Sequence, residues 1–135
     1  MEVVYSDQDS IELEEVVALY EALNWSSAKK PEQLINGLRG SHSLVTARIN
    51  RRLIGVANAI SDGHLVVYFP HMAVHPDFQR RGIGSEIMKR LQAKYARFHQ
   101  QQLTADVDAV RFYEKLGFER SGNTEPMWIY QGDEH

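Results

Sequence analysis

A glycine-rich segment is the part of the chain best suited to bind an anion. It reads Gln79-Arg80-Arg81-Gly82-Ile83-Gly84-Ser85 and joins an apolar stretch to an amphipathic one. If a helix begins near Gly82, its first turn offers unpaired backbone N–H groups and the positive end of the helix dipole, which both suit phosphate. Gly82 and Gly84 have no Cβ, so a pyrophosphate can approach the backbone closely. Arg80 and Arg81 can add charge-assisted hydrogen bonds.

Two familiar phosphate-binding motifs do not fit this segment. A dinucleotide fingerprint needs a third Gly or Ala where Ile87 stands. A P-loop needs Lys and then Ser or Thr after its last glycine, but Ser85 and Glu86 follow Gly84. On spacing alone, two interpretations stay open: a phosphate loop, or glycines that only shape a tight turn from strand to helix.

The elements that position this segment are predicted from apolar periodicity and turn residues. Strands are expected near 3–5, 43–47, 53–60, 64–74, 102–105, 118–121 and 127–130, and helices near 10–23, 31–40, 82–98 and 109–116. Pro70 lies inside the most apolar strand, and because proline cannot donate to a ladder we expect a bulge or a splay there. Asp9 and Glu12 have capping-box spacing at the start of the first helix. Hairpin strands come first and alternate with helices afterwards, which indicates a mixed α/β fold.

Composition limits the classes of function. The 135 residues suit one domain covering 1–135. A net charge of −3 argues against nucleic acid as the main partner, and the absence of cysteine excludes disulfides, thiolate metal sites and a cysteine nucleophile. No apolar run is long enough to span a bilayer and no signal peptide is recognisable, so we expect a cytoplasmic protein with no membrane role. His64, His71 and His75 lack metal-ligand spacing, so no metal site is expected.

A second block of residues narrows the interpretation of the glycine-rich segment. Val74-His75-Pro76 and then Gln-x-x-Gly-x-Gly are followed, about twenty-five residues later, by Ala109-Val110-Arg111-Phe112-Tyr113-Glu114-Lys115-Leu116-Gly117-Phe118. Together, and in this order, the two blocks strongly resemble the GNAT superfamily of acetyl-CoA-dependent N-acetyltransferases. The first block is similar to the family's cofactor loop after strand four, and the second to its Phe-Tyr-x-x-x-Gly-Phe signature. The resemblance runs from about Leu44 to Tyr130.

The resemblance implies both a fold and a cofactor. The fold would be a GNAT-like α+β fold: a mixed, mostly antiparallel sheet of six to seven strands, flanked by about four helices and splayed between strands four and five. Acetyl-CoA (coenzyme A) would be the acyl donor, with its pyrophosphate on the glycine-rich loop and its pantetheine arm along strand four. The implied cofactor contacts are Met72, Ala73, Val74, Gln79, Arg80, Arg81, Gly82, Ile83, Gly84, Ser85, Asp106 and Tyr113.

The same resemblance implies catalytic roles. Tyr113 matches the tyrosine that many relatives use as general acid toward the leaving thiolate, and its other interpretation is a core aromatic. His71 could take the proton of the incoming amine, although strand alternation puts it on the opposite face from Met72; ordered water is the alternative base. The N–H of Val74 would polarise the thioester carbonyl. Asp106 stands where relatives often have Asn, so it either contacts the pantetheine or caps a helix.

The acceptor side is less specified. Trp25, Tyr68 and His71 are the residues expected there, although Trp25 and Tyr68 also fit ordinary packing. Without a cysteine, the expected reaction is direct attack by a primary amine of a small molecule or peptide, in a ternary complex with acetyl-CoA. A non-catalytic acyl-CoA-binding module or sensor is the alternative, because Tyr68 stands where some relatives have a carboxylate. The resemblance also allows a homodimer, since many relatives pair through sheet edges or terminal strands.

Overall fold

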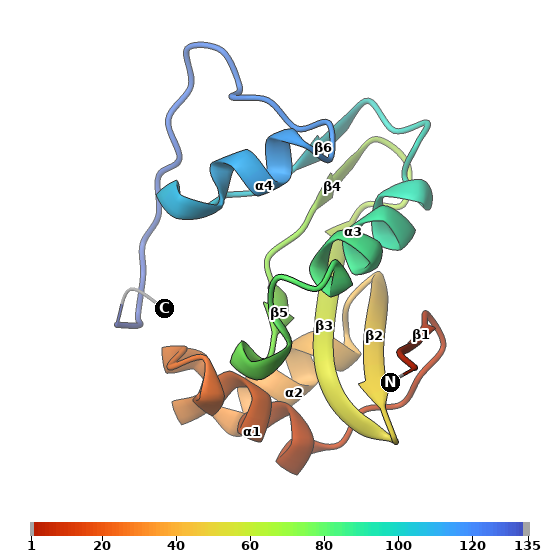
Figure 1. The fold of residues 1–135 in the computed structure, drawn as a ribbon. Coiled ribbons are helices and arrows are strands. Elements are labelled where there is room, and N and C mark those ends of the chain that lie inside the picture. Colours follow the sequence, from red (N-terminus) through yellow and green to blue (C-terminus); the bar gives the residue numbers. More distant parts are fainter. Residues whose placement is uncertain (1, 134–135) are drawn as a thin grey trace.

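The computed structural model describes residues 2–133, which form one mixed sheet with helices on both faces (Figure 1). Its strands are β1 (Val4–Ser6), β2 (Ser43–Ile49), β3 (Arg52–Ser61), β4 (Val66–Tyr68), β5 (Met72–Val74) and β6 (Gln100–Gln102). Its α-helices are α1 (Leu13–Ala22), α2 (Pro31–Arg39), α3 (Ile83–Ala93) and α4 (Val110–Glu114), and its short 3-10 turns are η1 (Ser26–Lys29), η2 (Pro76–Phe78) and η3 (Val107–Ala109). β4 and β6 pair in parallel, and the other strand pairs are antiparallel. The expected fold class is confirmed.

The β2–β3 hairpin forms the centre of the sheet. Asn50 and Arg51 both have positive φ (50° and 71°), which is the backbone of a two-residue turn whose twist matches its strands. β3 then pairs with β2 on one side and, on the other, with β4 and β5 in turn. A Cβ on Gly55 would lie 2.8 Å from Ile87 Cδ1, so the glycine lets α3 lie close against β3.

Two apolar layers hold the helices on the sheet. On one face, α3 buries its apolar stripe of Ile83, Ile87, Met88 and Leu91. On the other face, α1 and α2 bury the set Val16, Leu19, Tyr20, Leu34, Ile35 and Leu38. Both stripes follow the helical period, so each helix is positioned by the side chains it removes from water. Within residues 2–133, no helix combines the length and the apolarity that crossing a membrane requires.

Strand alternation is reset between β4 and β5. Val67 and Phe69 are buried in the layer beneath α3, and strict alternation would then send Met72 to the opposite face. Instead Met72 packs in the same layer, because Pro70 and His71 form an irregular connection that adds one residue. The irregularity expected at Pro70 is therefore confirmed.

The two chains beside β4 then part. β4 pairs with β6 as far as Tyr68 and Gln102, and the N–H of Phe69 still donates to the carbonyl of Gln102 at 3.0 Å. Beyond this point β5 pairs with β3 alone among the strands of residues 2–133. One edge of β5 is therefore left open, as the expected splay between the family's strands four and five requires.

The start of the first helix differs from the prediction. α1 begins at Leu13, and the carboxylate of Glu15 accepts a hydrogen bond from the N–H of Glu12 at 2.9 Å. Asp9, which was predicted to cap this helix, instead accepts hydrogen bonds from Thr46 and Arg48. The predicted cap at Asp9 is therefore wrong, and the capping box forms three residues later, between Glu12 and Glu15.

The two predicted strands near 118–121 and 127–130 are wrong. Neither segment has strand geometry, and the side chains of Met127 and Ile129 are 93% and 97% exposed. Residues 118–133, here called the C-terminal arm, leave the body beyond α4 and descend beside it (Figure 1). A β-rich pattern becomes a strand only when a partner edge is within reach, and this arm pairs with none within the described chain.

Candidate active site

The loop between β5 and α3 has a backbone shaped for a ligand. Arg80 and Gly82 have positive φ (65° and 82°), and α3 begins directly after Gly82. The amide Nε2 of Gln79 donates to the carbonyl of Val74 at 2.9 Å, which fixes the loop to the end of β5. The segment that the sequence marks for phosphate is thus a rigid turn leading into a helix.

The loop leaves six consecutive backbone donors without a protein acceptor. From Arg80 to Ser85 no N–H group bonds to any atom of residues 2–133, and the first bond into the helix runs from Glu86 N to Gly82 O at 3.0 Å. Such groups, added to the positive end of an eleven-residue helix, suit a pyrophosphate.

The two glycines of the loop have different functions. A Cβ on Gly82 would meet nothing within 4 Å, so its importance lies in its positive φ and in the open space around it. A Cβ on Gly84 would lie 3.1 Å from Met72 Cε and 3.4 Å from Phe112 Cζ. Gly84 therefore lets β5 and α4 lie close to the start of α3. Of the two interpretations that the spacing left open, a phosphate loop fits Gly82 and a tight turn from strand to helix fits Gly84.

The open edge of β5 offers backbone groups beside this loop. Asn58 N donates to His71 O, and His75 N donates to Ile54 O. Hydrogen-bonded and non-hydrogen-bonded pairs alternate along an antiparallel ladder, so Ala73, midway between these two, is also hydrogen-bonded to β3. The backbone groups of Met72 and Val74 consequently face the open side. Of the three residues expected to pair with pantetheine, Ala73 directs its own groups to β3 instead.

Tyr113 lies on α4, one residue after the ring that contacts Gly84. Its ring makes edge-on contacts with Phe112 and Phe118, at centroid distances of 4.9 and 5.9 Å. Burial, with a smaller contribution from the negative charge of Asp106, raises the pKa of Tyr113 to about 12. The phenol is therefore protonated at neutral pH and acts as a hydrogen-bond donor.

His71 belongs to an aromatic cluster on the other face of the sheet. Its Nδ1 lies 2.9 Å from the hydroxyl of Tyr20, and the rings of Tyr20 and Trp25 lie 5.4 and 5.8 Å from its own. Tyr20 is fully buried, and burial raises the pKa of its phenol well above the ordinary value. The structure thus brings together His71 and Trp25, two of the three predicted acceptor-side residues.

Comparison with known proteins identifies the family. Residues 7–127 match the family model described as the acetyltransferase (GNAT) domain. This chain belongs to the GNAT family of acetyltransferases. It is 31% identical over 124 residues to the uncharacterized N-acetyltransferase ycf52 of Porphyra purpurea, a match that covers 87% of this chain and 70% of that protein.

Solved structures agree with the GNAT assignment. A GNAT-family acetyltransferase of Streptococcus pneumoniae has a TM-score of 0.83 at 29% identity, over 96% of this chain and 99% of that one. An aminoglycoside N-acetyltransferase, solved in complex with CoA, shares the fold with a TM-score of 0.69 at 16% identity, over 96% of this chain and 94% of that one.

Two other aromatic residues of this acetyltransferase do not join the acceptor-side cluster. Tyr68 lies on an uncovered part of the sheet opposite Ile60, its partner in β3, and these side chains are 40% and 55% exposed. Trp128, which was expected to pack in a strand, stacks on Tyr130 in the C-terminal arm at 4.2 Å between ring centroids.

Tyr20 is the residue that the sequence interpretation missed. Helical spacing puts it on the apolar face of the first helix, and that spacing does not indicate a polar contact. The contact with His71 spans 51 positions of sequence and exists because α1 packs across the sheet at β5.

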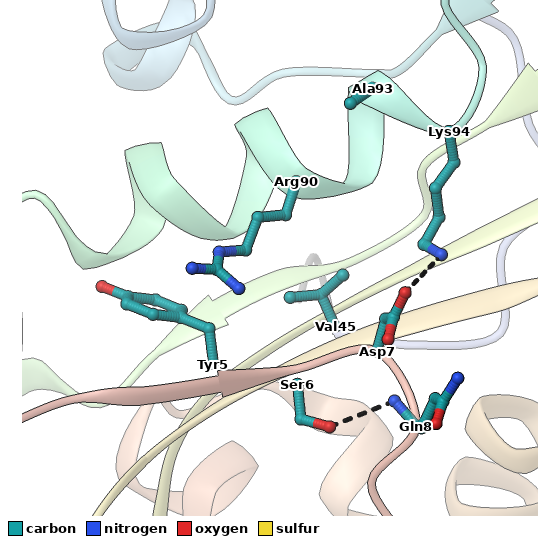
Figure 2. Close-up of a pocket in the computed structure, with 8 residues that line it drawn as sticks. All are labelled: Tyr5, Ser6, Asp7, Gln8, Val45, Arg90, Ala93 and Lys94. Carbon is teal, nitrogen blue, oxygen red and sulfur yellow. Dashed lines mark hydrogen bonds and ion pairs between the residues drawn. The ribbon is translucent and has the colours of Figure 1, made fainter.

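The acetyltransferase has another hollow, built differently, between β1 and α3. This cavity of about 450 Å³ is lined by Tyr5, Ser6, Asp7, Gln8, Val45, Arg90, Ala93 and Lys94 (Figure 2). Lys94 is 2.6 Å from Asp7, and Arg90 is 2.8 Å from Glu86, so each cation already has a carboxylate partner. No group of three or more metal-ligating side chains occurs within residues 2–133.

Proposed function

We propose that this acetyltransferase binds acetyl-CoA along β5 and the β5–α3 loop and transfers the acetyl group to a primary amine by direct attack. The observation that carries the proposal is the row of six free N–H groups from Arg80 to Ser85, directly beside the open edge of β5. The loop fits a pyrophosphate, and the edge fits an extended amide-containing arm.

On the donor side, the N–H groups of Met72 and Val74 would bond to the pantetheine amides and the thioester carbonyl. A donor placed at the carbonyl oxygen stabilises the negative charge that develops there as the amine attacks. The amine nitrogen then forms the new C–N bond and the C–S bond breaks, leaving CoA as a thiolate.

Tyr113 would donate a hydrogen bond to the departing sulfur. Full proton transfer from a phenol of pKa about 12 to an alkyl thiolate, whose conjugate thiol titrates near ~8.5, is uphill by ~3 to 4 pKa units. The phenol therefore lowers the barrier chiefly as a donor toward the developing negative charge.

His71 would accept the proton of the attacking amine. The hydroxyl of Tyr20 lies 2.9 Å from Nδ1 of His71 and would hold the imidazole ring in position for this task. Tyr20 is then a positioning residue, and Trp25 provides an aromatic wall beside the base.

Thiol release from acetyl-CoA over a panel of small-molecule and peptide amines tests the reaction. Tyr113→Phe removes only the hydroxyl, and we expect kcat to fall ~100-fold. Tyr5→Phe is the matched control, since Tyr5 lines the separate cavity between β1 and α3, and it should leave kcat unchanged. Equal turnover by wild type and Tyr113→Phe would remove Tyr113 from the mechanism.

The base is tested through pH. His71→Gln should lower kcat at pH 7, and the deficit should shrink as the pH rises toward the pKa of the amine, because a neutral amine needs no base. A deficit that is constant with pH would instead mean that His71 only shapes the site.

The sensor alternative rests on Tyr68, where some relatives have a carboxylate. Thermal stabilisation by acetyl-CoA without turnover on any amine would favour it. The His71–Tyr20 pair argues for the enzyme, because His71 is a basic group that could replace the carboxylate of those relatives.

The protein is also proposed to form a homodimer through the C-terminal arm. Met127 and Ile129 are almost fully exposed, and Ile60, Val66 and Tyr68 on one sheet face are about half exposed. Two uncovered apolar surfaces in one chain are both buried if the arm of one copy lies on the sheet of another.

Light scattering after size exclusion tests the dimer. Ile129→Asp should convert a dimer to a monomer, whereas Asn123→Asp adds the same charge to the arm at a polar position and should not. A wild-type monomer at high micromolar concentration would contradict this part of the proposal.

A further inference from the structure

Two arginines from separate segments meet at one aromatic ring beside the phosphate loop. The guanidinium carbons of Arg52 and Arg81 each lie 5.5 Å from the centre of the Phe78 ring. They are therefore no farther apart than twice that distance. Arg52 is the first residue of β3, whereas Phe78 and Arg81 belong to the β5–α3 connection, so the fold itself creates this cluster.

His75 also borders Arg52. Its Nε2 lies 3.2 Å from Nη2 of Arg52, and its Nδ1 lies 3.1 Å from the backbone N of Asp77. A guanidinium only donates and a neutral imidazole has one acceptor nitrogen, so His75 accepts from Arg52 or from Asp77, but not from both at once. Arg52 thus lies beside two rings and not beside an acid.

The cluster carries positive charge that the protein does not neutralise. Within residues 2–133, neither Arg52 nor Arg81 lies within 4.0 Å of a carboxylate, and their neighbours in sequence Arg51 and Arg80 do not either. The nearby acid Asp77 faces His75, at 3.9 Å. The chain as a whole has a net charge of −3, so this local excess is not a consequence of a basic composition.

The cations around the cavity in Figure 2 provide the contrast, because each of them has a carboxylate. A planar guanidinium group that lacks a carboxylate can donate two parallel hydrogen bonds to oxygens of a phosphate monoester, as charge-assisted pairs. Arg81 also belongs to the loop whose N–H groups are free, so an anion at the cluster would adjoin a pyrophosphate bound there.

We propose that Arg52, with Arg81 and Phe78, forms a second phosphate site, for the ribose 3′-phosphate of coenzyme A. This inference rests on the proposed function, since it assumes that the pyrophosphate of the same molecule lies on the loop. A phosphorylated acceptor would offer the same chemistry, but the 3′-phosphate is the monoester that arrives already joined to the pyrophosphate. Arg52 would therefore help the protein to distinguish CoA from 3′-dephospho-CoA.

Titration calorimetry with CoA and with 3′-dephospho-CoA tests the site. We expect wild type to bind CoA ~10-fold more tightly than 3′-dephospho-CoA, and Arg52→Gln to lose that preference by weakening CoA ~10-fold while changing 3′-dephospho-CoA less than ~2-fold. Arg97→Gln, an exposed arginine on the segment after α3, is the matched control and should keep the preference.

The outcomes separate the two proposals. Equal affinity of wild type for the two ligands, or an equal loss on both in Arg52→Gln, overturns the second phosphate site alone. Failure of wild type to bind either ligand overturns the proposed function as well. If Arg52→Gln leaves CoA binding unchanged and weakens only a phosphorylated amine, the cluster serves the acceptor and the inference is wrong.

Discussion

Two polar regions of the molecule are built in opposite ways. Around Arg48, between β2 and the start of α1, the charges are closed on one another: Nε lies 2.6 Å from Asp9 and Nη2 lies 2.8 Å from Glu15. The three side chains are only 19%, 23% and 26% exposed. In the β5–α3 loop, the backbone N–H groups from Arg80 to Ser85 have no acceptor, and the guanidinium of Arg81 has no carboxylate within 4.0 Å, among the described residues.

The difference separates polar groups that hold the fold from polar groups that wait for a ligand. The charges around Arg48 are poorly hydrated, so each needs its partner. Arg80, Arg81 and Gly82 are exposed, so the groups at the start of the loop can be hydrated when no ligand is bound. Changes around Arg48 should therefore alter folding, whereas changes in the loop should alter binding.

The largest expected effect is on stability. Arg48→Met leaves Asp9 and Glu15 with half-buried charges and no cation, and we expect the free energy of unfolding to fall by about 3 kcal/mol. Urea unfolding measures this. Arg97→Met, at an exposed arginine on the segment after α3, should change it by less than ~0.5 kcal/mol. An equal small loss in both variants would mean that the ion pairs of Arg48 with Asp9 and Glu15 do not hold the fold.

The second prediction is the reverse of the first: a substitution in the β5–α3 loop should alter binding and not stability. Arg81→Glu should weaken acetyl-CoA ~100-fold, because a cation at the phosphates becomes an anion, and should change the free energy of unfolding by less than ~0.5 kcal/mol. Calorimetric titration and urea unfolding of the same sample measure both. Arg97→Glu carries the same charge change outside the loop, and an equal loss of affinity there would reduce the effect to net charge.

Lowering the pH should weaken the ion pairs of Arg48 with Asp9 and Glu15. At Asp9 burial raises the pKa, but hydrogen bonds from Arg48 and Thr46 outweigh it and lower the value; at Glu15 the hydrogen bond from Arg48 lowers the pKa. Carboxyls with lowered folded pKa values stabilise fully above their unfolded values and lose that contribution as the pH falls through the folded ones. The stability difference between wild type and Arg48→Met should be constant from pH ~8 to ~5.

That difference should then shrink by about 1 to 2 kcal/mol toward pH ~2. Urea unfolding of both proteins across this range measures it. A difference that stays constant down to the lowest pH would show that the two carboxylates do not contribute through their charge.

The smallest expected effect distinguishes backbone strain at a glycine from a lack of space for a side chain. Gly82→Ala places a Cβ in the open but at a φ of 82°, and we expect the free energy of unfolding to fall by about 1 kcal/mol. Gly37→Ala, inside α2 with nothing within 4 Å of the added Cβ, should raise it by up to ~1 kcal/mol. Thermal unfolding of the pair measures both signs, and a matching sign would contradict the role given to φ.

Local signals made several elements around the β5–α3 loop predictable. The break at Pro70 and the amphipathic stripe of α3 depend on residues close in sequence, and each lies where the pattern indicates. The glycine-rich connection from strand to helix could be located for the same reason.

Contacts between distant segments were not predictable from one sequence. Tyr20 approaches His71, and Arg52 approaches Phe78, only because helices and hairpins pack across the sheet. The strands predicted near 118–121 and 127–130 failed for a related reason: residue types favour a strand, but a partner edge decides whether it forms.

The short length of β5 also protects the protein before its cofactor arrives. An unpaired strand edge is a template on which other chains can add strands and aggregate. The open edge of β5 is only three residues long and lies between Pro70 and Pro76, neither of which has an N–H to donate. The edge is therefore too short, and too closely bounded by proline, to start an intermolecular sheet.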